Sequence, residues 1–259
     1  MPYAFLTGMA ISSIGERTGS RTRQEYPPAV NGERNRLLID LPAEETDMLA
    51  GLLEPYEVRS RELMTEARHD ITHVHFPQSS VISLVTVLHD GGVEALTVGS
   101  DGMSGVPIIH GIKSTFCRIV GQIPGMSKRA PAHSFAEALP RLPELRRRAF
   151  LYSQLANEVT SQSAACNRVH VTEERCARWL LMSQDRVGRD EFELTQGFLS
   201  QMLGVRRPAV TVAIGILERA GLISHRRGTI GILDREGLEK ASCECYALVK
   251  ERERVLFAA

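Results

Sequence analysis

Arginine side chains gather in one short stretch near the end of the chain. Between Gly204 and Ile230 the sequence has five arginines and a single acid, Glu218, so the local charge is 5 − 1 = +4. The arginines are Arg206, Arg207, Arg219, Arg226 and Arg227. The whole chain is neutral, with 31 Lys+Arg against 31 Asp+Glu, so the excess is local. Clustered guanidinium groups suit phosphate anions, whose neutralisation drives much of the affinity of proteins for nucleic acids.

The residues around this cluster have the pattern of two helices joined by a glycine turn. Thr195 is a suitable N-cap for the first helix, and Gly204 supplies the turn. Pro208 falls in the first turn of the second helix, where its missing N–H loses no hydrogen bond. The apolar residues that we expect to be buried are Phe198, Leu199, Met202 and Leu203 in the first helix and Val210, Ala213, Ile214 and Leu217 in the second.

This arrangement predicts a helix-turn-helix followed by a wing. In a helix-turn-helix the N-terminal end of the second helix enters the major groove of DNA. After Gly221, two short strands around Arg226-Arg227-Gly228 predict the wing. Helix–glycine–helix pairs occur in many folds, and the wing and the arginine cluster are what favour DNA here. The candidate DNA-binding residues are Thr195, Arg206, Arg207, Pro208, Thr211, Val212, His225, Arg226 and Arg227.

The region that precedes the helices has a different pattern. From about residue 56 to residue 136, short apolar or alternating runs are separated by turn signals such as Asp90-Gly91-Gly92. Asp-Gly between β-rich runs predicts a hairpin, and several short strands at close spacing indicate a sandwich or barrel. A helical period follows Pro143, and its small or apolar residues recur at spacings of three and four: Leu145, Ala149, Tyr152, Ala156, Val159, Ser163 and Cys166.

This spacing favours a seam with a parallel copy of the same helix, which predicts a homodimer. Leu151 and Leu155 supply a second stripe that suits the barrel of the same chain. The alternative is a plain amphipathic helix that packs on the barrel alone.

The order of these parts resembles the Crp/Fnr superfamily of bacterial regulators. The barrel portion of the resemblance is carried by Val74-His75-Phe76-Pro77, Asp90-Gly91-Gly92-Val93-Glu94 and Val98-Gly99-Ser100-Asp101-Gly102. The other portion is carried by Leu203-Gly204-Val205-Arg206-Arg207-Pro208 and Leu217-Glu218-Arg219-Ala220-Gly221. The resemblance implies a cytoplasmic homodimeric transcription regulator that binds double-stranded DNA, with RNA polymerase as a further candidate partner.

The implied fold is α+β: a jelly-roll barrel, a long dimerisation helix and a winged helix-turn-helix. We expect five parts: a flexible leader at 1–33, a jelly-roll sensor domain like those that bind cyclic nucleotides at 34–140, the dimerisation helix at 141–168, the DNA-binding domain at 169–245, and a C-terminal tail at 246–259.

The departures from the family pattern limit the signal that the barrel can sense. Family members that bind cyclic nucleotides use a Gly-Glu pair and an arginine, but Ser104-Gly105-Val106 lacks the acid and Arg118 lies one or two places away. We therefore expect no binding of cyclic AMP. Iron–sulfur sensors of the family need N-terminal cysteines, and the first cysteine here is Cys117. Where other members read DNA through Arg, Glu and Arg, this chain has Arg207, Pro208 and Val212.

The remaining residues with reactive side chains form no recognisable site. Cys243-Glu244-Cys245 has no second pair of cysteines nearby, and its thiols are interpreted as structural. His73 and His75 share one face of a strand, which is interpreted as an ordinary strand face. We expect no metal, cofactor or catalytic residues, no membrane segment and a cytoplasmic location. A second hypothesis is a ligand or redox sensor whose helix-turn-helix contacts protein. It predicts an intact ligand site and a depleted DNA-facing surface, the reverse of this sequence.

Overall fold

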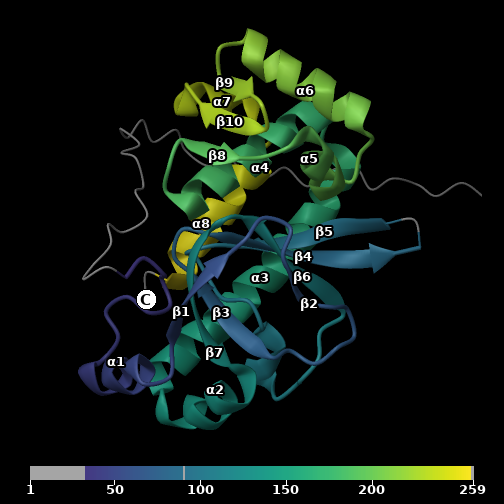
Figure 1. Cartoon of the computed structure of the whole chain (residues 1–259). Helices are drawn as coiled ribbons and strands as arrows, with labels where there is room; N and C mark the ends of the chain where they lie inside the picture. Colours follow the sequence, from purple (N-terminus) through teal and green to yellow (C-terminus); the bar gives the residue numbers. More distant parts are fainter. Residues whose placement is uncertain (1–32, 90, 258–259) are drawn as a thin grey trace, which may run out of the picture.

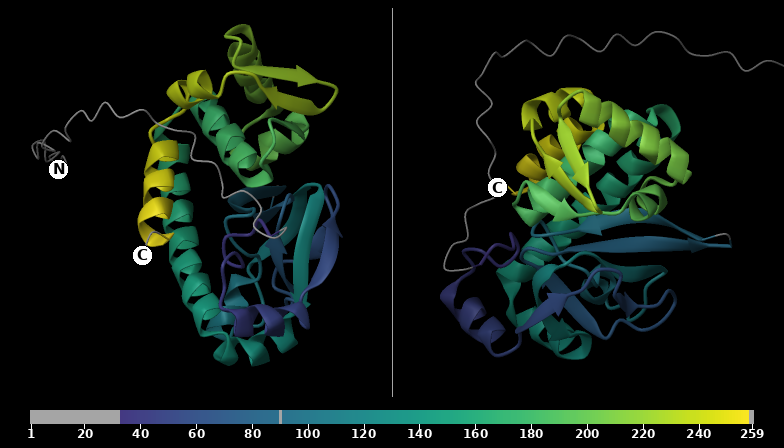
Figure 2. Two further views of the ribbon diagram at one scale, coloured as in Figure 1. Left: turned by 90° about the vertical axis from the view of Figure 1, so that its left-hand side faces the viewer. Right: turned by 45° about the horizontal axis from the view of Figure 1, so that its top comes forward.

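The computed structural model describes residues 33–89 and 91–257. The predicted leader at 1–33 lies outside these residues except for its last position. A β-rich unit forms the lower half of the molecule, and a smaller, mostly helical unit lies above it (Figure 1). A long helix, α3 (Pro143–Val169), runs along one side of the β-rich unit and leads into the helical unit (Figure 2). The predicted α+β class is confirmed.

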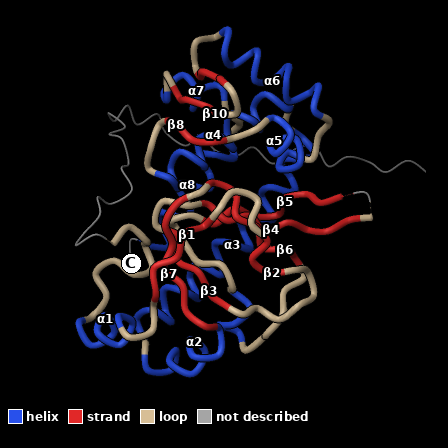
Figure 3. Tube along the Cα trace, viewed as in Figure 1, coloured by secondary structure: helices blue, strands red, loops and turns tan. Residues whose placement is uncertain are grey.

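The β-rich unit has two antiparallel sheets, visible as the red segments in the lower half of Figure 3. One sheet has the order β1-β7-β3, and the other has the order β2-β6-β4-β5. The strands are β1 (Glu54–Val58), β2 (Leu63–Thr65), β3 (His73–Pro77), β4 (Val81–Leu88), β5 (Gly91–Val98), β6 (Cys117–Ile123) and β7 (Gly125–Pro131). Alternating apolar side chains such as Val74, Phe76 and Ile82 are fully buried between the sheets.

Short helices close the ends of this unit. They are α1 (Ala43–Ala50), α2 (Ala132–Ala138) and the 3₁₀ helices η1 (Val106–His110) and η2 (Leu139–Arg141). Helix α1 also orients α3, because the Glu45 carboxylate accepts hydrogen bonds from the backbone N–H groups of Glu144 and Leu145 at 2.8 and 2.9 Å. A carboxylate at this position satisfies donors that an α-helix leaves open at its start.

The predicted dimer seam is wrong as a surface for a second copy. Leu145, Ala149 and Tyr152 are at most 2% exposed within a single chain, and Ala156 and Val159 are at most 9% exposed. The barrel and neighbouring helices already cover this stripe, as in the alternative of an amphipathic helix packed on its own chain. A spacing of three and four identifies a buried helix face but not the element that buries it. The opposite face of α3 carries exposed Phe150, Asn157 and Ala164.

The upper unit packs four helices and a small sheet around one core. Its elements are α4 (Thr172–Val187), β8 (Glu191–Glu193), α5 (Gln196–Leu203), α6 (Arg207–Arg219), β9 (Ile223–Arg226), β10 (Thr229–Ile232) and α7 (Arg235–Ala241). The sheet has the order β8-β10-β9 and is antiparallel throughout. Its core includes Leu180, Leu199, Val210 and Ile230, each fully buried.

The last segment differs from the predicted tail, to which no structure was assigned. Residues 245–257 form helix α8 (Cys245–Phe257), which lies alongside α3 (Figure 2). Arg252 forms an ion pair with Glu158 of α3 at 2.5 Å, and Val249 and Tyr246 are buried. Helix α8 is therefore packed against α3 rather than free. No helix in the described ranges is long and apolar enough to cross a bilayer.

Candidate nucleic-acid interface

The turn between α5 and α6 forms as the sequence predicts. The Thr195 side chain accepts a hydrogen bond from the backbone N–H of Phe198 at 3.2 Å and so caps α5. Gly204 ends α5 with a φ of 63°, in the left-handed region that favours glycine. Helix α6 begins at Arg207, with Pro208 in its first turn. The cap, the glycine and the proline together fix where α5 ends and α6 begins, and so set the angle between the two helices.

Helix α6 has a buried face and an exposed face. Val210, Ala213, Ile214 and Leu217 are at most 2% exposed, as expected for the inner stripe. Arg206, Arg207, Pro208 and Thr211 are exposed, and Val212 is 56% exposed. The exposed face carries the predicted DNA-contacting residues of the second helix, and helix α6 itself lies in the upper part of the molecule (Figure 1).

Three segments converge at the start of α5. The Arg207 guanidinium lies directly over Gly197, where any side chain would collide with it. The Thr211 hydroxyl donates a hydrogen bond to the Gln196 side-chain oxygen at 2.8 Å. From the wing, the Gly228 carbonyl accepts a hydrogen bond from the backbone N–H of Leu194 at 2.6 Å. The beginnings of α5 and α6 and the turn of the wing therefore form one continuous surface.

The wing is a tight hairpin that presents two arginines. Arg227 and Gly228 both have positive φ, at 46° and 83°, which is the backbone of a tight two-residue hairpin turn. Arg226 and Arg227 are exposed at the end of strands β9 and β10. His225 is half-buried, and its backbone N–H donates to Glu218 at 3.3 Å. Of the predicted residues on the wing, His225 is therefore the least accessible.

The surface arginines have no acidic partners among the residues that the structure describes. Among residues 33–89 and 91–257, no carboxylate forms an ion pair with Arg206, Arg207, Arg219, Arg226 or Arg227. An exposed guanidinium without an internal partner keeps its donors available for a phosphate or a base edge. We name Thr195, Gln196, Arg206, Arg207, Thr211, Arg226 and Arg227 the arginine surface.

Two residues of this region were missed by the sequence analysis. Gln196 holds Thr211 and so orients the outer face of α6. Its position directly after the N-cap was the signal that could have identified it. Arg61, in the β-rich unit, donates a hydrogen bond to the Thr195 hydroxyl at 3.3 Å. These residues are 134 positions apart, so no local pattern could have linked them.

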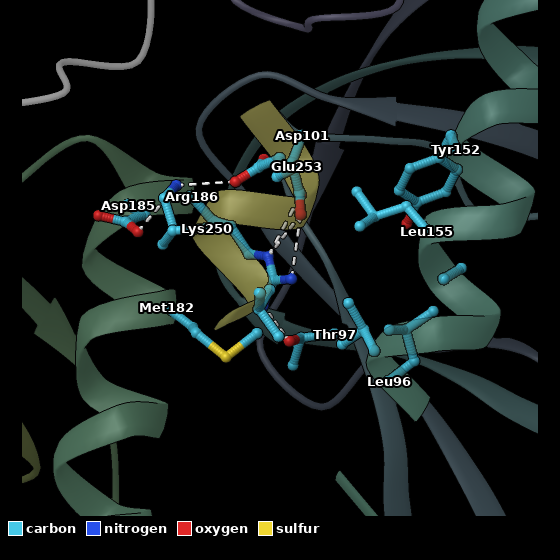
Figure 4. Close-up of a pocket in the computed structure, with 13 residues that line it drawn as sticks. Leu96, Thr97, Asp101, Tyr152, Leu155, Met182, Asp185, Arg186, Lys250 and Glu253 are labelled. Atoms are coloured by element: carbon cyan, nitrogen blue, oxygen red, sulfur yellow. Dashed lines mark hydrogen bonds and ion pairs between the residues drawn. The ribbon is translucent and has the colours of Figure 1, made fainter. Parts of the chain in front are cut away.

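Below this surface, α4 joins the two units through buried polar contacts. Arg186 of α4 forms an ion pair with Asp101 at 3.0 Å, and the Asp101 and Arg186 side chains are 7% and 5% exposed. They line a narrow pocket together with Tyr152, Lys250 and Glu253 (Figure 4). Burial raises the pKa of the Asp101 carboxyl, but the charge and hydrogen bonds of Arg186 outweigh it and hold the pKa below its ordinary range.

A second polar contact lies between β5 and α4. The Glu94 carboxylate accepts hydrogen bonds from the Trp179 indole N–H at 3.0 Å and from the Ser83 hydroxyl at 2.7 Å. Burial raises the pKa of Glu94 above its ordinary value, although these hydrogen bonds oppose the shift. The two units are therefore held together by specific polar groups as well as by apolar contact.

The barrel residues considered for cyclic-nucleotide and metal binding have different surroundings. Arg118 is 46% exposed and pairs with Glu66 at 2.6 Å on the outer side of β6. His75 is buried against Tyr56, and burial together with the neighbouring His73 and Arg129 lowers its pKa to about 3. The ring centroids of His73 and His75 lie 6.2 Å apart on the strand face predicted for them.

Comparison with known proteins agrees with this geometry. The Crp-like helix-turn-helix domain family matches residues 174–241. No curated protein is similar enough in sequence to count as a relative. Among solved structures, FixK2 from Bradyrhizobium japonicum has a TM-score of 0.60 at 15% identity, covering 74% of this chain and 98% of its own.

Two further structures have a similar fold. A transcriptional regulator of the CRP family from Thermus thermophilus, TTHB099, has a TM-score of 0.59 at 15% identity and covers 72% of this chain and 96% of its own. The c-di-GMP-responsive global regulator CLP from Xanthomonas campestris has a TM-score of 0.56 at 12% identity and covers 74% of this chain and 99% of its own.

Proposed function

We propose that this chain, which combines the Crp/Fnr fold with a Crp-like helix-turn-helix domain, is a transcription regulator that binds double-stranded DNA in a sequence-specific way. The observation that carries the proposal is the arginine surface. It joins the starts of α5 and α6 to the wing, and its guanidinium groups have no carboxylate partners within the described ranges. Such a surface suits the phosphates that flank a major groove.

The residues of the arginine surface would divide their roles by position. Arg207 stands at the start of α6, where its guanidinium can reach base edges, and a bidentate contact to guanine is the expected chemistry. Pro208, Thr211 and Val212 would line the groove beside it. Arg226 and Arg227 lie at the wing turn, where only the DNA backbone is within reach, so we assign them to phosphates.

The active species would be a homodimer on a two-fold symmetric site, with half-sites about one helical turn apart. Because the predicted seam is buried inside one chain, the second copy would contact the opposite face of α3. Phe150 is 38% exposed there, and Asn157 and Ala164 are small enough to let two helices approach closely. Because Ala156 is buried within its own chain, a substitution there would test the folding of the chain rather than the formation of a dimer.

The barrel would serve as the sensor domain, for a signal other than cyclic AMP. The outward position of Arg118 and its pairing with Glu66 support this part of the proposal, because a buried cyclic phosphate needs a guanidinium aimed into the barrel. RNA polymerase would be a partner in activation, and DNA as the ligand implies a cytoplasmic location.

The proposal is tested by measuring binding to random-sequence duplex DNA as a function of salt. A DNA-binding surface gives an affinity that falls steeply with salt, by a slope of roughly 0.9 for each phosphate contacted. The matched control is Arg141→Ala, an exposed arginine in η2 far from the arginine surface, which should leave affinity and slope unchanged. If wild-type protein binds no duplex at low salt, the function is wrong and the helix-turn-helix contacts another protein.

A further inference from the structure

Four side chains with metal-binding atoms meet at the far end of α3. Cys166 lies in its last turn, and His170 directly follows it. Cys243 comes from the link between α7 and α8, and Cys245 begins α8, more than 70 positions along the chain. The four ligand atoms all lie within 4.8 Å of one another. The three cysteines are at most 4% exposed and form a cluster separate from the main hydrophobic core.

We propose that Cys166, His170, Cys243 and Cys245 bind one Zn²⁺ ion in a tetrahedral site. With Zn–S bonds of about 2.3 Å, two sulfur ligands on one tetrahedral ion are about 3.8 Å apart. The Cys166 and Cys243 sulfur atoms are 3.6 Å apart, and the Cys245 sulfur is 3.6 Å from Nδ1 of His170. Three thiolates with one imidazole are a ligand set typical of structural zinc.

The spacing disfavours the other chemistry open to clustered cysteines. A disulfide needs sulfur atoms about 2.05 Å apart and would leave the third thiol unused. The irons of an iron–sulfur cluster are separate atoms, so ligands to different irons lie farther apart than ligands to one ion. Four ligand atoms within 4.8 Å therefore suit a single metal ion.

Neighbouring groups orient the ligands as in known metal sites. The Glu244 carboxylate lies 3.0 Å from Nε2 of His170, so that Nε2 donates its proton outward and Nδ1 faces the sulfur atoms. A carboxylate behind a histidine ligand is the usual second partner at such sites. The Gln162 side-chain amide donates to the Cys245 sulfur at 3.0 Å and helps to orient it.

The local charge also suits a metal–thiolate complex. One Zn²⁺ with three thiolates and a neutral imidazole has a net charge of about −1. Arg178 of α4 is 6% exposed and lies near Cys166 and Cys243. The Nε atoms of Arg175 and Arg178 are buried without a hydrogen-bond partner in the described ranges. An anionic centre would balance these buried cations, which a set of neutral thiols does not.

The site would tie together segments that the chain itself leaves separate. His170 and Val171 are extended residues between α3 and α4, where the β-rich unit passes into the helix-turn-helix. An ion bound there would link the end of α3 to α7 and α8. The proposed role is therefore structural: the ion holds the helix-turn-helix at a defined angle to α3.

The test is metal analysis of the full-length chain purified with a non-thiol reductant. We expect one zinc per chain, and after exchange with Co²⁺ we expect the visible absorption bands of a tetrahedral ion with thiolate charge transfer. Cys166→Ser and Cys243→Ser should lose both signals. Cys117→Ser is the matched control, because Cys117 lies on β6 outside the cluster, and it should retain them.

A milder variant keeps the test informative if the cysteine variants fail to fold. Glu244→Gln changes a 68% exposed side chain behind His170 and should weaken Co²⁺ binding about 10–100-fold, as the loss of such a partner usually does. A wild-type protein that takes up neither Zn²⁺ nor Co²⁺ would overturn the proposal. So would an absorption spectrum of bound iron with sulfide, or Co²⁺ binding that Glu244→Gln leaves unchanged.

Discussion

The arginines of the arginine surface and the arginines of α4 have opposite surroundings. Arg206, Arg207 and Arg227 are exposed and have no carboxylate partner in the described ranges, whereas Arg175, Arg178 and Arg186 of α4 are at most 6% exposed. Arg186 is fully engaged by Asp101 and by the Thr97 hydroxyl. The buried Arg186 holds the two units together, whereas the exposed arginines are the ones that we propose for DNA recognition.

The largest expected effect is on the buried pair. Asp101→Ala removes the carboxylate that pairs with the buried Arg186 guanidinium, and we expect the free energy of unfolding to fall by about 3–5 kcal/mol. Urea denaturation followed by circular dichroism measures this loss. Glu66→Ala, which breaks the exposed pair with Arg118, is the control and should leave the midpoint nearly unchanged. If the two variants lost the same free energy of unfolding, the buried and the surface arginine pairs would not differ in their contribution to stability.

The next largest effect is on DNA recognition by α6. Arg207→Ala should weaken binding to the cognate site by about 1–3 kcal/mol and flatten the preference for one base pair in each half-site. Its unfolding midpoint should stay close to that of the wild type, because Arg207 is exposed. Binding to a randomised-site library measures affinity and preference together. A uniform loss with unchanged preferences would make Arg207 a phosphate contact and contradict its place at the base edges.

The wing should give a smaller effect that is independent of sequence. Arg226→Ala/Arg227→Ala removes two proposed phosphate contacts, so the slope of log affinity against log salt should become shallower by about 1.8. Cognate and random DNA should lose affinity alike. Fluorescence anisotropy at several salt concentrations measures both quantities, and Arg141→Ala again serves as control. A selective loss on the cognate site would mean that the wing reads bases.

The smallest effect concerns the pH dependence of stability at the contact between β5 and α4. Because burial raises the pKa of Glu94 in the folded chain, its contribution to stability is present at low pH and is lost as the pH rises above about 4.3, the ordinary pKa of glutamate. Glu94→Gln should therefore gain stability relative to the wild type as the pH rises above about 4. Thermal unfolding across this range measures the difference.

The control for this prediction has the opposite sign. The hydrogen bond from Arg118 lowers the pKa of Glu66, so its contribution is present at neutral pH and is lost as the pH falls. Glu66→Gln should therefore lose stability only slightly relative to the wild type as the pH rises, because the pair with Arg118 is exposed. If the stability of both variants relative to the wild type changed in the same direction with pH, the titration of Glu94 would not be the source of the effect.

Local structure was the part of this protein most open to prediction from its sequence. The Thr195 cap, the left-handed Gly204 and Pro208 in the first turn of α6 each depend on the geometry of a few consecutive residues. The buried stripe of α6 was also correct, because a helical period states which residues share a face. The role of these residues in DNA binding stays a prediction.

The predictions that were wrong concern the element against which a helix face packs. The seam of α3 was correctly identified as apolar, but its covering comes from the same chain. Helix α8 was left as a tail, although buried Tyr246 and Val249 recur at a spacing of three. The Asp101–Arg186 pair joins residues 85 positions apart, and Cys166 and Cys243 are 77 apart. No short-range pattern contains information about such distant contacts.

By itself, the sequence determined the helices, the strands, the turn residues and the sign of the charge on the surface, because these follow from backbone preferences and side-chain period over a few residues. Tertiary structure alone decided which arginines are exposed, which face of α3 is free, and that four distant metal-binding side chains meet. The reason is that burial and long-range contacts depend on how whole elements pack, and many different sequence separations lead to the same short distance in space.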